Sequence, residues 1–155
     1  MNPRALEIIK KLELIEHPEG GYFREVYRSE LEVHSSIVGS ARFAVTEIYF
    51  LLCQGQVSRF HKVAHDEFWH FYEGAPLRLI DGDLESFQEL ELGGEELNYQ
   101  HCIRGGCWQA AESTGDYTLV GCTVAPGFDF ADFAFLNEDE SKLVKSNFAD
   151  YAKFI

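Results

Sequence analysis

The chain has 155 residues, a length typical of one domain that buries its own apolar core. Hydrophobic residues make up 46% and aromatic residues 14%, a composition that excludes a disordered chain. The 26 acidic residues outnumber the 13 basic ones, for a formal net charge of -13. The length predicts one domain over residues 1–155. Because no cluster of Lys and Arg interrupts the negative charge, we expect no nucleic-acid partner.

The chain carries no sign of secretion or membrane insertion. No segment approaches the ~20 apolar residues of a membrane span. Charged residues interrupt the apolar residues at the start of the chain, so a signal peptide is not expected there. No two of the four cysteines form a CxxC motif, and in a chain of this size we expect them to be reduced thiols. We therefore predict a cytoplasmic protein with no membrane partner.

The two ends of the chain predict short helices. Asn2 and Pro3 form a helix start, and apolar residues at helical spacing continue it to about Leu14. Asn137 with Glu140 three residues later is the cap signature of a second helix.

The chain between these helices predicts a series of short strands separated by turns rich in Gly, Pro and Asp. Such a series is typical of a β-sandwich or a barrel, so the fold class is all-β with short N- and C-terminal helices. Alternating phenylalanines after Pro126 are expected to pack in the core or at an interface rather than to hold a ligand. The expected strands are residues 22–27, 42–52, 68–80, 86–92, 98–103, 107–111 and 117–124.

The segment from Gly55 to Gly74 carries most of the candidate chemistry, since it holds three of the six histidines. Strand side chains alternate, so Arg59 and His61 should share one face of the first arm, and Glu67 and Trp69 one face of the second. If the two arms pair as a hairpin, His61 and Glu67 converge. An imidazole beside a carboxylate can begin a divalent metal site, form an acid/base pair, or make a structural hydrogen bond.

The spacing of Gly55, His61, Glu67 and Gly74 resembles the first cupin motif. Val63 stands where that motif has its second histidine. A weaker likeness to the second motif keeps its glycine but places Arg104, Gln109 and Ser113 at the proline, histidine and asparagine positions.

Five further segments resemble one uncharacterised, single-domain branch of the cupins that is similar in shape to the dTDP-sugar epimerases. The resemblance implies a cupin double-stranded β-helix, or jelly-roll barrel, with its core over about residues 22–135, and it implies a homodimer. It implies no established reaction. These segments are Glu19–Phe23, Ser58–His61, Asp66–His70, Trp108–Ala111 and Val124–Phe128.

The resemblance also bears on the cofactor, because a full cupin metal site uses three histidines and a glutamate. Here the remaining set is His61, Glu67 and Gln109, and an amide oxygen is a poorer ligand than imidazole for such metals. The cofactor is therefore left open, with a divalent metal as one alternative.

The other histidines are expected to play smaller parts. His70 should face away from Glu67 on a regular strand, and His65 should be solvated in a turn. His101 is left open between pocket, outer wall and dimer contact. His17 and His34 lie far from the cluster in sequence and are not expected to be functional.

The remaining candidate residues are those expected to line a ligand pocket. Arg59, Trp69 and Gln109 would add a cation, an aromatic wall and an amide to the acid/base pair, and such cavities hold small polar molecules. Glu47 is the expected partner of Arg59, and Tyr49 could add a phenol.

Three functions follow as hypotheses. The first is a small-molecule-binding cupin for a sugar-like or carboxylate ligand, with isomerase or epimerase chemistry in which His61 accepts a proton and Glu67 sets its tautomer. The second is a metal-dependent oxygenase or decarboxylase. The third is a non-catalytic ligand-binding or sensor module.

Overall fold

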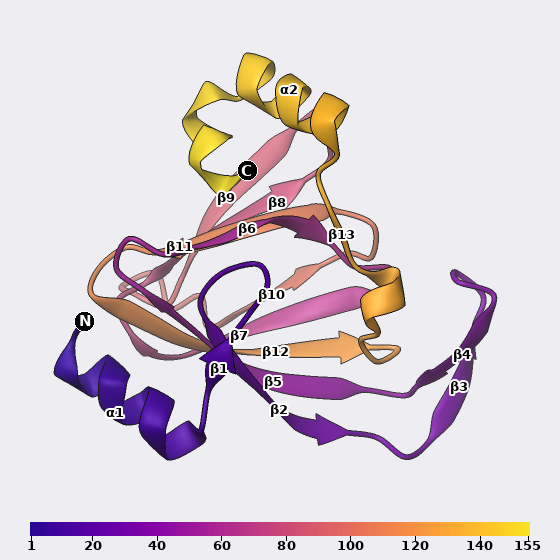
Figure 1. The fold of residues 1–155 in the computed structure, drawn as a ribbon, viewed down its shortest axis with the longest axis horizontal. Coiled ribbons are helices and arrows are strands. Elements are labelled where there is room, and N and C mark those ends of the chain that lie inside the picture. Colours follow the sequence, from indigo (N-terminus) through magenta and orange to yellow (C-terminus); the bar gives the residue numbers. More distant parts are fainter.

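Two facing β-sheets form most of the computed structural model, which describes residues 1–155 (Figure 1). One sheet has the strand order β1-β2-β5-β12-β7-β10 and the other the order β13-β6-β11-β8-β9, while β3 and β4 form a separate pair. The expected all-β jelly roll is confirmed. Its strands are β1 (Ile15–Glu16), β2 (Tyr22–Arg28), β3 (Glu32–Ser35), β4 (Ser40–Phe43), β5 (Thr46–Cys53), β6 (Val57–Lys62), β7 (Asp66–Gly74), β8 (Leu77–Gly82), β9 (Phe87–Leu92), β10 (Gln100–Ile103), β11 (Trp108–Ser113), β12 (Tyr117–Ala125) and β13 (Ala134–Phe135).

The helices begin where the sequence predicts. Helix α1 (Pro3–Leu12) starts after Asn2, whose side chain accepts from the N–H of Arg4, and helix α2 (Glu138–Asn147) starts with a full capping box between Asn137 and Glu140. The 3₁₀ turns η1 (Phe130–Asp132) and η2 (Ala149–Phe154) flank α2 in sequence. No helix is both long enough and apolar enough to cross a membrane.

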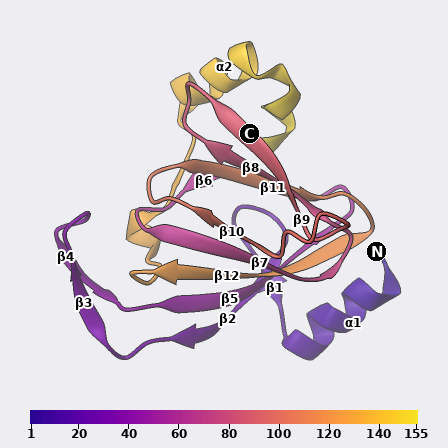
Figure 2. The same cartoon turned by 180° about the vertical axis from the view of Figure 1, so that it is seen from behind.

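Three apolar clusters hold the layers together. The largest lies between the sheets and includes Phe50 and Trp69. A second joins α1 to the outer face of the six-stranded sheet, through Ile8 and Leu51. A third lies where α2 and η2 cover the outer face of the five-stranded sheet, as seen from both sides in Figures 1 and 2. Both sheets therefore have a buried inner face, and each outer face is covered at least in part.

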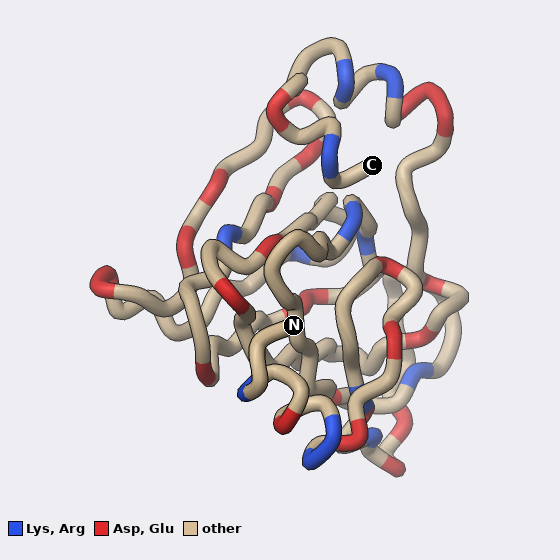
Figure 3. The backbone as a smooth tube through the Cα atoms, turned by 60° about the vertical axis from the view of Figure 1, so that its left-hand side comes forward, with Lys and Arg blue, Asp and Glu red and all other residues tan.

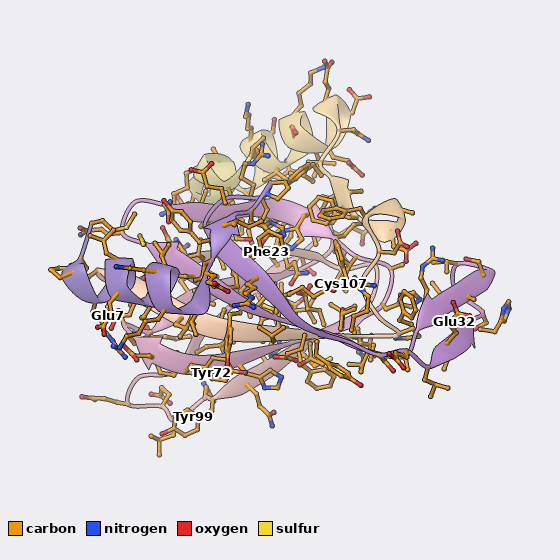
Figure 4. The ribbon with its side chains drawn as sticks, turned by 60° about the horizontal axis from the view of Figure 1, so that its bottom comes forward. Glu7, Phe23, Glu32, Tyr72, Tyr99 and Cys107 are labelled. Atoms are coloured by element: carbon orange, nitrogen blue, oxygen red, sulfur yellow. The ribbon has the colours of Figure 1, made fainter.

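The hairpin β3–β4 projects from the sheets and was not predicted (Figures 1 and 4). The expected strand 42–52 is divided between β4 and β5, and Ala44 and Val45 lie between them. Ser35 at the end of β3 lies 2.6 Å from His65 Nε2, so His65 is buried. The expectation of a solvated His65 was wrong because the hairpin covers the turn in which it lies.

The two arms of the segment 55–74 do not form a hairpin, contrary to expectation. Strand β6 pairs with β11 and β13, whereas β7 pairs with β12 and β10 in the other sheet. The three residues 63–65 carry the chain from one sheet to the other. His61 and Glu67 consequently approach each other across the interior and not along a shared ladder.

A bulge in β6 reverses the expected alternation of its side chains. His61 pairs with Gln109 and Ser58 with Ala111, so one extra residue of β6 lies opposite Ala110. Ser58 and His61 are both buried, while Arg59 is exposed. The guanidinium of Arg59 donates to the carbonyl of Pro18 and lies over the ring of Phe135. The prediction that Arg59 faces inward with His61 was therefore wrong.

The turn before β2 depends on Gly20. Its φ is +109°, and a Cβ there would lie 2.1 Å from the carbonyl oxygen of Val57. We expect Gly20→Ala to lower the free energy of unfolding by at least about 2 kcal/mol, because backbone strain and a backbone clash add. Urea denaturation measures this loss.

Gly39→Ala is the matched control, since Gly39 also has a positive φ of +69° but has no atom within 4 Å of the added Cβ. It should cost only the strain of the left-handed backbone, about 1 kcal/mol. Equal losses in the two variants would contradict the close approach of Gly20 to Val57.

Candidate functional site

A cavity of about 350 Å³ lies between the sheets and is open to solvent on one side. Phenylalanine rings form much of its wall, and its polar groups come from both sheets and from the turn before β2. The polar set is His17, Glu19, Glu25, Arg28, Thr46, His61, Glu67, Cys122 and Asp129, and the phenylalanines are Phe23, Phe43, Phe128, Phe130 and Phe133. The phenylalanines after Pro126 pack edge-on against one another, as expected, and three of them also line the cavity because the loop after β12 folds back over it: Phe128, Phe130 and Phe133.

His61 is buried and held in one tautomer. Its Nδ1 lies 2.7 Å from the carbonyl oxygen of Arg59, an acceptor only, so Nδ1 carries the hydrogen. Its Nε2 lies 3.0 Å from Glu19 Oε2, and the ring stacks on Phe133. Burial lowers the pKa of His61, which favours the neutral ring. The Arg59 carbonyl, and not Glu67 as expected, sets the tautomer.

Glu19 lines the cavity, although the sequence analysis did not single it out. It is buried, and its Oε1 accepts a 2.7 Å hydrogen bond from Ser58. The backbone N–H of Arg59 also donates to the carbonyl of Glu19, which fixes this turn against β6. Burial raises the pKa of Glu19, so its carboxyl group holds a proton more tightly than an exposed one does. The only sequence signal was its place in the Glu19–Phe23 segment of the cupin resemblance.

Glu67 belongs to a hydrogen-bonded chain that spans the interior. The indole N–H of Trp69 donates to Gln109 Oε1 at 2.8 Å, and Gln109 Nε2 donates to Glu67 Oε2 at 2.5 Å. An indole can only donate, so this bond fixes which end of the Gln109 amide is oxygen. Burial raises the pKa of Glu67 to about 7. Trp69 and Gln109 are fully enclosed and support Glu67 from behind; neither lines the cavity.

Two further predicted pocket residues lie on the other face of the six-stranded sheet. The carboxylate of Glu47 accepts from Thr123, and Tyr49 contacts Tyr72 and lines a groove beside α1. Neither lines the cavity, because β5 turns Thr46 and Ile48 inward. The predicted pairing of Glu47 with Arg59 is therefore wrong, as is the pocket position of Tyr49.

The other histidines divide between the cavity and the outer surfaces. His70 bonds to Thr123 on the outer face, as the alternation predicted. His101 lies 2.9 Å from Asp81 in a separate hollow, so it does not reach the cavity. His17, which was not expected to be functional, lines the cavity beside Glu19.

Comparisons with known proteins agree with this architecture. A family model described as cupin superfamily (DUF985) matches residues 6–136. The chain belongs to the cupin superfamily. It is 32% identical to the uncharacterized protein YML079W of Saccharomyces cerevisiae, over 90% of this chain and 80% of that one.

Two solved structures are similar to this cupin over nearly their whole length. A hypothetical protein from Leishmania major has a TM-score of 0.84 at 28% identity, covering 97% of this chain and 96% of that one. Protein SO0799 from Shewanella oneidensis has a TM-score of 0.79 at 33% identity, covering 94% and 90%. The uncharacterised branch expected from the sequence is therefore confirmed.

The donor atoms of this cupin do not fit the metal that many members of the fold hold. Val63 replaces one histidine ligand, and the Gln109 amide directs its nitrogen toward Glu67 while its oxygen accepts from Trp69. His61 Nε2 faces Glu19. No three His, Cys, Asp or Glu side chains are arranged to hold a metal ion. The set His61, Glu67 and Gln109 thus offers two ligands where a stable site needs three or four.

The raised pKa of Glu67 has a consequence for stability. Between pH 4.5, its ordinary pKa, and about 7, the folded state binds this proton more tightly than the unfolded state. The free energy of unfolding should therefore fall as pH rises through this range, by at most about 1.4 kcal/mol per pH unit from this group.

Glu67→Gln isolates this contribution, because Gln keeps the shape and cannot ionise. We expect the variant to gain stability relative to the wild type from pH 5 to 7, with a constant difference above pH 7. Urea denaturation at each pH provides the comparison. A difference that does not change with pH would contradict a raised pKa for Glu67.

Proposed function

We propose that this cupin binds a small, uncharged, sugar-like molecule in the cavity and catalyses proton transfer on it, as an isomerase or epimerase does. The observation that carries the proposal is the placement of two acid/base groups on opposite walls of one cavity. Glu67 comes from the six-stranded sheet, and His61 with Glu19 from the other side. Transfer of a proton off one face of a substrate and back onto another requires such a pair.

The hydrogen bonds favour distinct roles for the two groups. A pKa near 7 suits Glu67 to take up a proton at neutral pH. The lone pair of His61 Nε2 is engaged by Glu19, and this pair shares one proton that it can give to a ligand. Glu67 is then the acceptor and His61 with Glu19 the donor, whereas the sequence analysis expected His61 to accept the proton.

The charges around the cavity favour the sugar-like ligand over the carboxylate. Arg28 is the single lysine or arginine in the lining, and both its Nε and Nη2 donate to the carboxylate of Glu25. An anionic ligand would meet Glu19 and Glu67 without a free cation to neutralise it, which is costly in a buried site. Phenylalanine walls and a few fixed polar groups suit a neutral molecule.

Proton transfer can be followed by incubating the protein with neutral aldoses and ketoses in D₂O and recording loss of C–H signals by NMR. We expect exchange next to the carbonyl, reduced about 100-fold or more in Glu67→Gln and in His61→Asn. Thermal shift with the same sugars and with the matching sugar acids reports binding.

The outcomes separate the three functions. A sugar that stabilises the protein but exchanges no proton would point to a binding or sensor module and contradict catalysis. Stoichiometric uptake of Fe, Mn, Ni or Zn that is lost in His61→Ala would favour the metal-dependent enzyme instead.

We also propose that the protein forms a homodimer through the outer face of the six-stranded sheet. Phe68, Tyr72 and Tyr99 are exposed there. Figure 4 shows Tyr72 and Tyr99 on the side away from Phe23. Acidic residues are spread along much of the chain (Figure 3), so exposed aromatic side chains such as these are the groups best suited to form a contact between two copies.

Light scattering tests the dimer. We expect a mass twice the 17.7 kDa of one chain, reduced to a single chain in Phe68→Glu, because the new carboxylate would be buried unpaired at the contact. Leu31→Glu, on the surface next to the projecting hairpin, is the control and should stay dimeric. If the Leu31→Glu variant dissociates and Phe68→Glu does not, the dimer contact does not lie on the outer face of the sheet.

A further inference from the structure

His17 is a polar side chain that the proposed acid/base pair does not use. Only 7% of its side chain is exposed, and it lines the cavity beside Glu19. Its ring packs edge-on against Phe23 and Phe50, with centroids 4.4 and 5.7 Å apart. These contacts leave the ring little freedom to turn.

A backbone hydrogen bond fixes the tautomer of His17. The N–H of Glu19 donates to His17 Nδ1 at 3.2 Å, so Nδ1 carries a lone pair and the hydrogen of the neutral ring is on Nε2. Burial lowers the pKa of His17, which keeps the ring neutral. The turn is held by two further bonds, from His17 N–H to the Gly21 carbonyl and from Gly20 N–H to the His17 carbonyl.

The Nε2–H of His17 has no partner within the protein. Every buried side-chain nitrogen and oxygen is hydrogen-bonded, so an Nε2 without a partner is one that the cavity exposes. A neutral N–H fixed in direction and facing a cavity is a donor for a ligand oxygen. The His17 ring therefore differs from the His61 ring, in which Nδ1 and Nε2 both have partners within the protein. It also differs from a charged imidazolium, which would suit an anion.

We propose that His17 is a further catalytic residue, whose Nε2–H donates to the carbonyl oxygen of a neutral hydroxy-carbonyl substrate. The inference rests on the proposed function. Glu67 takes the proton from the carbon next to the carbonyl, the C–H electron pair forms the C=C bond of an enediolate, and the carbonyl π pair moves to the oxygen. The His17 N–H stabilises the negative charge that develops on that oxygen. Return of a proton to carbon completes the exchange, and no oxidant or reductant is needed.

Two substitutions separate this role from the structural one. His17→Asn keeps an acceptor for the Glu19 N–H, because Asn Oδ1 can take the place of Nδ1, but it removes the donor to the cavity. His17→Gln extends an amide N–H toward the position of Nε2. With dihydroxyacetone in D₂O, we expect the exchange rate constant to fall about 100-fold in His17→Asn, with KM changed much less, and to be partly restored in His17→Gln. A wild-type rate in His17→Asn would overturn the inference.

A second readout does not depend on turnover. In protein labelled with ¹⁵N-histidine, the ring spectrum should show His17 as the Nε2–H tautomer at pH 7, and the Nε2–H signal should shift on titration with dihydroxyacetone. An Nδ1–H tautomer, or no shift at saturating dihydroxyacetone, would overturn the donor role. A shift without any proton exchange in the wild type would instead refute the proposed function and leave the donor role of His17 standing.

Discussion

Two carboxyl groups buried between the sheets without a lysine or arginine in contact are the constraint on which the site depends. Glu19 and Glu67 lie deep in the cavity, and the partners that reach them are the neutral donors Ser58 and Gln109 and the imidazole of His61. Burial of a charge without a cation is costly, so both groups have raised pKa values. Both carboxyl groups therefore hold a proton more tightly than an exposed carboxyl group does.

Each carboxyl group is positioned by structure that lies outside the cavity. Glu67 is held by Gln109, and Gln109 by the indole of Trp69, so the apolar core between the sheets sets the orientation of a polar group. Glu19 is held by a turn in which Gly20 approaches the backbone of Val57 too closely for any side chain. Rigid support of this kind is what proton transfer requires, because donor and acceptor must stay within hydrogen-bonding distance of the substrate.

The residues at the two positions where the cupin motifs have metal-binding histidines serve the apolar core and a hydrogen-bonded chain instead. Val63 packs in the place of one histidine, and Gln109 uses its amide to bind Glu67. With a histidine at position 109, the N–H of Trp69 would lose the amide oxygen that accepts its hydrogen bond. The turn before β2 supplies His17 and Glu19 instead, so the polar groups of the cavity come from segments that lie far apart in the chain.

Much of the fold follows from local patterns in the sequence. Turn residues and apolar alternation predicted the β-rich core, and the caps at Asn2 and Asn137 predicted both helices. His61 and Glu67 line one cavity as expected, although the hairpin on which that expectation was based does not form. Alternation also placed His70 on the outer face. These features depend on neighbours along the chain, so a single sequence contains them.

Only the tertiary structure decided which other residues join the site. The bulge that turns Arg59 outward results from pairing with β11, some fifty residues away, and no local pattern encodes it. His17 and Glu19 reach the cavity because their turn packs on β6, and the phenylalanines after Pro126 reach it because the chain folds back over the opening. Contacts between distant segments determine burial, and burial determines the pKa values and the chemistry.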